Sequence, residues 1–110
     1  MITWEEFEKV EIRVGTIVEV EDFPEARRPA YKIKVDLGEE LGVKKSSAQV
    51  TELYTKEELR GLQVICVCNF PPKQIGKYMS EVLVTGFYTD EKKVVLSTVE
   101  RKVPNGARLC

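Results

Sequence analysis

The stretch from Val10 to Glu21 constrains the fold more than any other part of the chain. Apolar and polar residues alternate along it, a pattern that predicts a long β-strand with one buried face. The expected apolar phase consists of Val10, Ile12, Val14, Thr16, Val18 and Val20. Gly15 interrupts the middle of this stretch, and a glycine inside a strand marks a bulge or a tight bend. A long strand that bends halfway suits a closed barrel.

The other strands are expected to be short and separated by turns. Alternation and apolar runs predict them at residues 31–37, 43–50 and 62–70, in a hairpin of 81–88 with 94–98, and at 107–110. Glycines punctuate a turn at residues 38–42, and a loop rich in proline, glycine and lysine is expected at residues 71–80.

Two capping boxes predict two short helices. Thr3 precedes Glu6 by three residues, and Thr55 precedes Glu58 by the same spacing. The second helix falls between the third and fourth strands, which is the element order of an OB-fold. The sequence therefore predicts an all-β, five-stranded OB-fold Greek-key barrel with a short N-terminal helix, and a single domain over residues 1–110.

Catalysis has little support in the residue types present. The chain has no histidine, which removes the commonest general base and the commonest metal ligand. A serine nucleophile would have to use Lys44 or Lys45 as its base, and no glycine-rich nucleotide loop occurs. We expect no catalytic residue, no metal site and no cofactor.

Membrane insertion and export are not expected either. The sequence contains no apolar run of about 18 residues, and its first residues are acidic, unlike a signal peptide. The cytoplasm is the expected compartment.

The three cysteines leave two interpretations open. An odd number argues against a disulfide framework. Cys66 and Cys68 are two apart in an apolar run, so they belong to one face of a strand. They are either a redox pair or half of a metal site, or two small core residues; Cys110 stands alone.

Charge is distributed unevenly although the net charge is only −1. Residues 1–26 carry two basic and eight acidic residues, whereas residues 27–77 carry ten basic and six acidic ones. A basic middle section permits a local cationic patch on an acidic protein. Alternating charges on strands are also common on an ordinary solvated face, so the pattern alone does not identify a ligand.

Two segments place polar and aromatic side chains where strands end. Residues 44–49 supply lysines, serines and an amide, and residues 69–81 combine donors with Phe70, Tyr78 and Met79. Single-stranded RNA is bound by such mixtures, because cations contact phosphates and flat apolar groups stack on bases. An extended peptide could use the same groups.

These segments also carry a family resemblance. Residues 7–18 resemble the first strand of the tRNA-binding-domain family, which includes the C-terminal domain of many methionyl-tRNA synthetases. Asn69-Phe70-Pro71-Pro72-Lys73-Gln74-Ile75-Gly76, followed by Ser80-Glu81, is similar to the family signature. The segments that are similar to its CsaA branch of export-related chaperones are residues 23–27, 29–30, 45–49, 69–72, 80–84 and 103–106.

The resemblance implies a non-catalytic OB-fold homodimer that binds tRNA and also acts as an export-related chaperone. Two alternatives stay open, namely a chaperone for extended apolar peptides with no RNA ligand, and an accessory subunit that delivers tRNA to a synthetase. The resemblance and the composition together suggest RNA or peptide contacts from Arg13, Lys45, Ser47, Gln49, Asn69, Phe70, Lys73, Lys77, Tyr78, Met79 and Ser80.

The N-terminal helix offers a second argument for a dimer. Ile2, Trp4 and Phe7 fall within six residues at this end of the chain, and together they are too much apolar surface to leave in water on a small barrel. The helix either covers the end of its own barrel or packs on a partner's copy. The last strand, with Leu109, is expected to join the same interface.

Overall fold

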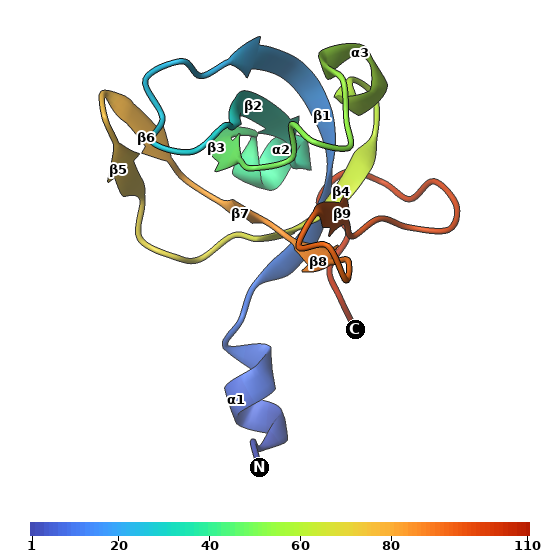
Figure 1. The fold of residues 1–110 in the computed structure, drawn as a ribbon. Coiled ribbons are helices and arrows are strands. Elements are labelled where there is room, and N and C mark those ends of the chain that lie inside the picture. Colours follow the sequence, from blue (N-terminus) through green and yellow to red (C-terminus); the bar gives the residue numbers. More distant parts are fainter.

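The computed structural model describes all residues from Met1 to Cys110. Its centre is a five-stranded antiparallel sheet with the strand order β3-β2-β1-β4-β7, curled into a nearly closed barrel (Figure 1). The strands of this sheet are β1 (Ile12–Asp22), β2 (Tyr31–Asp36), β3 (Val43–Ala48), β4 (Gln63–Val67) and β7 (Leu83–Val84). The predicted all-β, OB-like barrel is confirmed, with α3 (Lys56–Leu59) between β3 and β4 as expected.

The long first strand bends, and its bend changes which side chains point inward. The register with β2 shifts between Ile17 and Glu19, as at a β-bulge. As a result Ile17 is buried, whereas Val18 is 47% exposed. The predicted phase, which grouped Val18 with Val14 and Val20, is therefore wrong at this position, because an extra residue in a strand reverses the alternation beyond it.

Gly15 allows the end of β2 and the residue after it to approach β1 closely. A β-carbon on Gly15 would lie 2.5 Å from Val35 Cγ1, 2.7 Å from Leu37 Cδ2 and 2.9 Å from the Asp36 carbonyl oxygen. These are distances that real β-carbons do not reach. Val35 and Leu37 are both fully buried and belong to the hydrophobic core, so the missing side chain of Gly15 is what lets this part of the core pack.

The barrel closes where its two edge strands meet over a short distance. Glu81 N and Val82 N donate to the Lys45 carbonyl oxygen at 2.7 and 3.4 Å. Ser46 Oγ, which is buried, donates to the Val82 carbonyl oxygen at 2.9 Å. Closure therefore runs through residues 45–46 of β3 and residues 81–82 just before β7.

Two small hairpins complete the β-structure. The predicted late hairpin is confirmed as β8 (Gly86–Tyr88) paired with β9 (Val94–Leu96). The sequence did not predict the other, β5 (Lys73–Ile75) with β6 (Tyr78–Ser80), in the expected loop. It also did not predict α2 (Gly38–Leu41), which occupies the expected turn. The expected last strand is reduced to a single bridge between Arg13 and Arg108.

The N-terminal helix α1 (Trp4–Glu8) begins with the predicted capping box of Thr3 and Glu6. It projects away from the barrel (Figure 1), and only Phe7 among its residues is partly buried. The expectation that α1 could cover the end of its own barrel is therefore wrong. Trp4 packs only on the helix's own Phe7, at a ring-centroid distance of 5.3 Å, and remains 66% exposed. None of the three helices has the length and apolar character needed to cross a membrane.

The close approach at Gly15 yields a stability prediction. We expect Gly15→Ala to lower the free energy of unfolding by about 1–3 kcal/mol, because the added methyl group overpacks a core that cannot easily move. Urea denaturation would measure the change. Val18→Ala on the exposed side of the same strand is the control and should stay within about 0.5 kcal/mol of the parent. Equal midpoints for the parent and Gly15→Ala would contradict this account of the close approach at Gly15.

Candidate nucleic-acid interface

Tyr78 anchors the β5–β6 hairpin to the barrel. Its hydroxyl donates to the carbonyl oxygen of Ile33 at 3.1 Å, with that of Ser46 at 3.4 Å as a second acceptor. Its ring packs edge-on against Phe23 at a centroid distance of 5.5 Å. Burial of the phenol raises the pKa of Tyr78 to about 12. These contacts fix the Tyr78 ring against the barrel and so position the hairpin. The ring is therefore not available for stacking on a nucleic-acid base.

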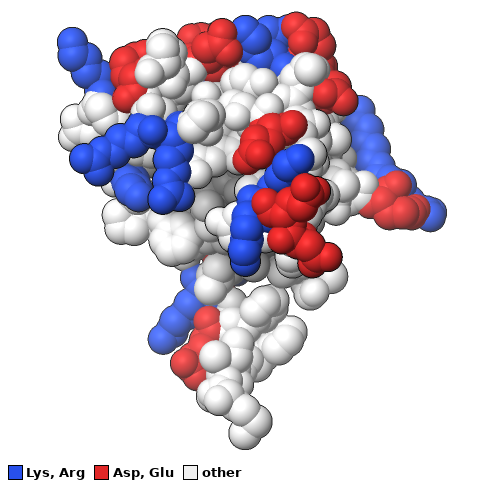
Figure 2. Space-filling view, viewed as in Figure 1, with Lys and Arg blue, Asp and Glu red and all other residues white.

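Cationic side chains surround this anchor. Lys32 Nζ lies 5.2 Å from the centre of the Phe23 ring, and Lys45 Nζ lies 5.4 Å from that of Tyr78. Both are within the range of a cation–π contact. Lys73 and Lys77 extend from the hairpin itself and are exposed. Figure 2 shows Lys and Arg gathered on the side where Figure 1 places β5 and β6.

We call the set of Arg27, Lys32, Lys45, Lys73 and Lys77 the cationic face. Arg27 comes from the loop between β1 and β2 that begins at Phe23, and it is exposed. Within this set only Lys32 has an acidic partner, Glu25, at 3.8 Å. The other cationic groups are free of ion pairs, so they can contact the phosphates of a ligand without first breaking a contact within the protein.

Apolar side chains stand exposed beside these cations. Phe70 is 55% exposed and Met79 is 38% exposed. The pairing of Gln74 with Met79 puts these two residues on the same face of the hairpin. Tyr78 and Ser80, one residue to either side of Met79, contact β2 and β3, so Gln74 and Met79 face away from the barrel.

Three residues of the family-like signature serve the barrel itself. Ser80 Oγ accepts a hydrogen bond from Ser47 N at 3.3 Å, and Glu81 Oε1 accepts one from Lys45 N at 2.9 Å. These side chains satisfy donors on the edge of β3 that no neighbouring strand reaches. Their first role is to close the barrel.

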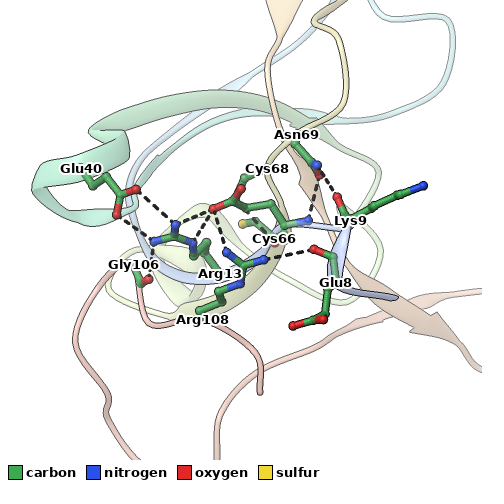
Figure 3. Close-up of polar contacts among 10 residues, drawn as sticks. Glu8, Lys9, Arg13, Glu40, Cys66, Cys68, Asn69, Gly106 and Arg108 are labelled. Carbon is green, nitrogen blue, oxygen red and sulfur yellow. Dashed lines mark hydrogen bonds and ion pairs between the residues drawn. The ribbon is translucent and has the colours of Figure 1, made fainter. Parts of the chain in front are cut away.

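Asn69, the third of these residues, fixes the point where α1 joins β1 (Figure 3). Its Oδ1 accepts a hydrogen bond from Glu11 N at 2.9 Å, and its Nδ2 donates to the Lys9 carbonyl oxygen at 2.6 Å. Cys68 N adds a bond to the Glu11 carbonyl oxygen at 2.8 Å. The end of β4 thus holds the base of α1, and both polar atoms of the Asn69 amide already have a backbone partner.

Arg13 lies in a separate cluster of charges (Figure 3). Its guanidinium group contacts the carboxylates of Glu40 and Glu11 and donates to the Gly106 carbonyl oxygen at 3.0 Å. Hydrogen bonds to Glu40, and then to Glu11, raise the pKa of Arg13 above its ordinary value. The side chain is only 11% exposed. Arg13 therefore ties β1 to α2 and to the C-terminal segment.

The structure brings most of the sequence-predicted contact residues together, but not all. The group at the hairpin and β3 consists of Lys45, Ser47, Lys73, Lys77, Tyr78, Met79 and Ser80. Phe70 precedes the hairpin, and Gln49 follows β3 as an exposed residue. Arg13 and Asn69 lie in the clusters just described. Contact with a ligand stays a prediction for every one of these residues.

The cysteines belong to the core and its margin. Cys66 is fully buried in the core, and burial raises the pKa of its thiol to about 12. Burial also raises the pKa of Cys68, and all three cysteines are free. No group of three or more His, Cys, Asp or Glu side chains is placed to hold a metal ion. The interpretation of Cys66 as a core residue is confirmed.

Sequence reasoning missed two features of this surface. One is Arg27, whose only signal was an arginine pair in a loop fixed by prolines. The other is a groove of about 810 Å³ between residues 47–52 and residues 83–88. The groove lies between segments that are far apart in the chain, so no local sequence pattern predicts it.

Comparison with known proteins decides the family. The family model described as "Putative tRNA binding domain" matches residues 12–108. The chain belongs to this tRNA-binding-domain family. The predicted resemblance is thereby confirmed, and the match spans the whole barrel, from the first residue of β1 to the C-terminal segment.

Several solved structures share the fold. The CsaA chaperone protein from Picrophilus torridus is 48% identical, with a TM-score of 0.94 and full coverage of both chains. Chaperone CsaA from Bacillus anthracis is 43% identical, with a TM-score of 0.93 over 100% of this chain and 99% of that one. The MetRS related protein from Pyrococcus horikoshii is 27% identical, with a TM-score of 0.87 over 100% and 98%.

Curated relatives are much longer proteins. Methionine–tRNA ligase of Thermococcus kodakarensis is 36% identical over 98% of this chain, but the match covers 14% of the ligase. For Methanocaldococcus jannaschii the ligase is 33% identical over 93% of this chain and 15% of its own length. The tRNA-binding domain thus corresponds to a small part of each ligase.

A substitution at Asn69 would test whether this residue has a structural role or contacts a ligand. We expect Asn69→Ala to lower the free energy of unfolding by about 1–2 kcal/mol, since two hydrogen bonds are lost and two backbone groups lose partners. Thermal and urea denaturation measure this, with Lys73→Ala as an exposed control that should change stability by less than about 0.5 kcal/mol. A variant as stable as the parent that binds RNA less well would instead make Asn69 a ligand contact.

Proposed function

We propose that this domain binds tRNA, or another structured RNA, through the cationic face. The observation that carries the proposal is the group of unpaired cations around the Tyr78 anchor, on a domain of the tRNA-binding family. Affinity of proteins for nucleic acids comes largely from neutralising phosphates. An acidic protein with net charge −1 needs such a local concentration of cations to do so.

In this mechanism, residues of different chemistry contact different parts of the RNA. Lys73, Lys77 and Arg27 contact phosphates, and Lys45 contributes from β3. Phe70, more than half exposed, supplies the apolar surface on which an unpaired base stacks. The exposed amide of Gln74, on the hairpin, is suited to hydrogen-bonding base edges. The domain acts by binding and performs no catalysis, and we propose that residues 1–110 work as one unit.

We further propose that two copies associate through α1. Ile2 and Trp4 are 70% and 66% exposed, and Leu109 near the C-terminus is 46% exposed. Figure 1 places α1 and the C-terminus at the same end of the molecule. Two cationic faces in one dimer would bind one RNA with higher avidity than a single face.

A chaperone role is the second candidate function. Two solved relatives of 43–48% identity are CsaA chaperones. Exposed aromatic residues at β8, with Phe87 at 73% and Tyr88 at 75%, give this chain apolar surface for an unfolded polypeptide. We place both activities in the cytoplasm, where free thiols such as these stay reduced. A role in protein export is proposed only as part of the chaperone role.

Delivery of tRNA to a synthetase is a third role that fits the same surface. The relatives among methionine–tRNA ligases carry this domain within a longer chain. Co-purification of a synthetase with the protein would support this role over independent action.

The cationic face makes a quantitative prediction about salt. Binding of tRNA should weaken steeply as salt rises, with a log–log slope of about −0.7 to −0.9 per phosphate contact. Lys73→Glu should weaken binding at every salt concentration and reduce the slope by about 1. Fluorescence anisotropy with labelled tRNA measures both.

Lys102→Glu is the matched control for that experiment. It makes the same charge change at an exposed position on the loop that follows β9, far from the hairpin in Figure 1. Equal losses for the two variants would place binding outside the cationic face. An unfolded protein tested in the same salt series should show weak salt dependence if the chaperone role is separate.

The dimer proposal predicts the molecular mass of the protein in solution. Light scattering at micromolar concentration should give twice the mass of one chain. Trp4→Ser should shift the protein toward monomer, because it removes a large apolar contact, whereas Val18→Ser on the barrel wall should not. A parent protein that is monomeric at this concentration would rule out the α1 interface.

A further inference from the structure

The groove between residues 47–52 and residues 83–88 is a seam where the barrel stays open. Closure between the two edges of the sheet ends at Lys45, Ser46, Glu81 and Val82. Beyond these residues the edges separate, and a groove of about 810 Å³ lies between them. We call it the seam groove. Its walls are the end of β3 with the residues that follow, and the run from β7 into β8.

The β3 wall offers backbone groups without partners. In β3 the backbone groups of alternate residues point away from β2, as the bonds of Lys45 and Ser47 to Glu81 and Ser80 show. By the same alternation the Ser47 carbonyl oxygen points away from β2, as Ser47 N does. Neither backbone group of Gln49 has a hydrogen-bond partner. These groups form an open strand edge at the groove.

The opposite wall is also an open edge. Thr85 N donates to the Ile65 carbonyl oxygen at 3.0 Å, and Ser97 N donates to the Thr85 carbonyl oxygen at 3.0 Å. Thr85 thus pairs with β4 and β9. By alternation its neighbours Val84 and Gly86 direct their backbone groups away from these strands, toward the groove. Open edges of this kind accept an added strand.

The side chains of the groove define the chemistry of a guest. Leu83 is 48% exposed, Phe87 73% and Tyr88 75%, so the run from β7 to β8 offers a strip of apolar surface. Arg28 and Lys92 are cationic residues of the lining, against one acidic residue, Glu52. The groove therefore combines an apolar strip with a positive rim.

Lys92, which lines the groove, has an unusual backbone conformation. Its φ of 66° is the only left-handed value at a residue other than glycine in the chain. Such a conformation costs free energy at a lysine, and glycine or asparagine would suit this turn better. A strained residue whose charged side chain lines a groove fits a role in binding.

We propose that the seam groove binds an extended polypeptide segment as an added β-strand. The segment has apolar side chains at alternate positions, which pack on Leu83, Phe87 and Tyr88, and an acidic residue that pairs with Arg28 or Lys92. The proposal rests on the chaperone role and gives it a site separate from the cationic face. Backbone pairing explains how such a site accepts many sequences, because every peptide carries the same donors and acceptors.

The test uses a blocked, fluorescein-labelled peptide with the sequence Asp-Val-Thr-Val-Thr-Val-Asp. Its matched control carries N-methyl groups on alternate residues, which keeps the side chains and removes backbone donors. Two lost hydrogen bonds of about 0.5–1.5 kcal/mol each predict a loss of affinity between about 5-fold and 150-fold for the methylated peptide. Equal binding of the two peptides would overturn strand addition.

Variants of the protein locate the site. Phe87→Ser and Lys92→Glu should each weaken peptide binding several-fold while leaving tRNA binding unchanged. Phe70→Ser on the hairpin is the control and should leave peptide binding unchanged. The reverse result would move the peptide to the hairpin and overturn the proposal, and displacement of the peptide by tRNA would make the groove an RNA site. Light scattering and thermal denaturation check that each variant keeps the assembly and stability of the parent.

The peptide and tRNA experiments test the seam groove and the cationic face separately. If the peptide does not bind, but tRNA binding still depends on Lys73, the seam groove loses its role and the cationic face keeps its own.

Discussion

Closure of the barrel between β3 and the residues before β7 is the interaction on which the rest of the surface depends. It uses three hydrogen bonds to or from Lys45 and Ser46, plus two in which Ser80 and Glu81 side chains accept from the β3 edge. The hairpin that carries Lys73 and Lys77 comes directly before these residues, so its position follows from closure. The groove begins where closure ends. One short contact therefore separates two surfaces of different chemistry.

Much of the fold could be predicted because its signals are local. Alternation located β1 and β2, and capping boxes located α1 and α3. The bulge between Ile17 and Glu19 could not be placed, because it depends on how β1 pairs with β2. The hairpin around Gly76 was missed for a similar reason. Its strands are three residues long, and the contacts of Tyr78 with Ile33 and Ser46 hold them in place.

The candidate site was predictable in composition but not in geometry. Lys73, Lys77, Phe70 and Met79 belong to one segment, so their proximity follows from the sequence. The position of Arg13 does not, since Glu40 is 27 residues away and reaches it only through α2. For Asn69 and Ser80 a motif identified the residues, but the structure shows that their polar groups are engaged within the barrel. A shared signature can thus preserve an architecture as well as a ligand contact.

The way α1 is attached has a consequence for how assemblies of such domains are built. The helix is held at its base by Asn69, by the Cys68–Glu11 backbone bond and by the hydrogen bond that Arg108 donates to the Glu8 carbonyl oxygen at 3.2 Å, and most of its surface is exposed. Its direction is therefore set by the joint at residues 9–11, independently of the residues on the helix surface. In the proposed dimer, changes on the helix surface would alter which partner is bound without altering the direction in which α1 leaves its own barrel.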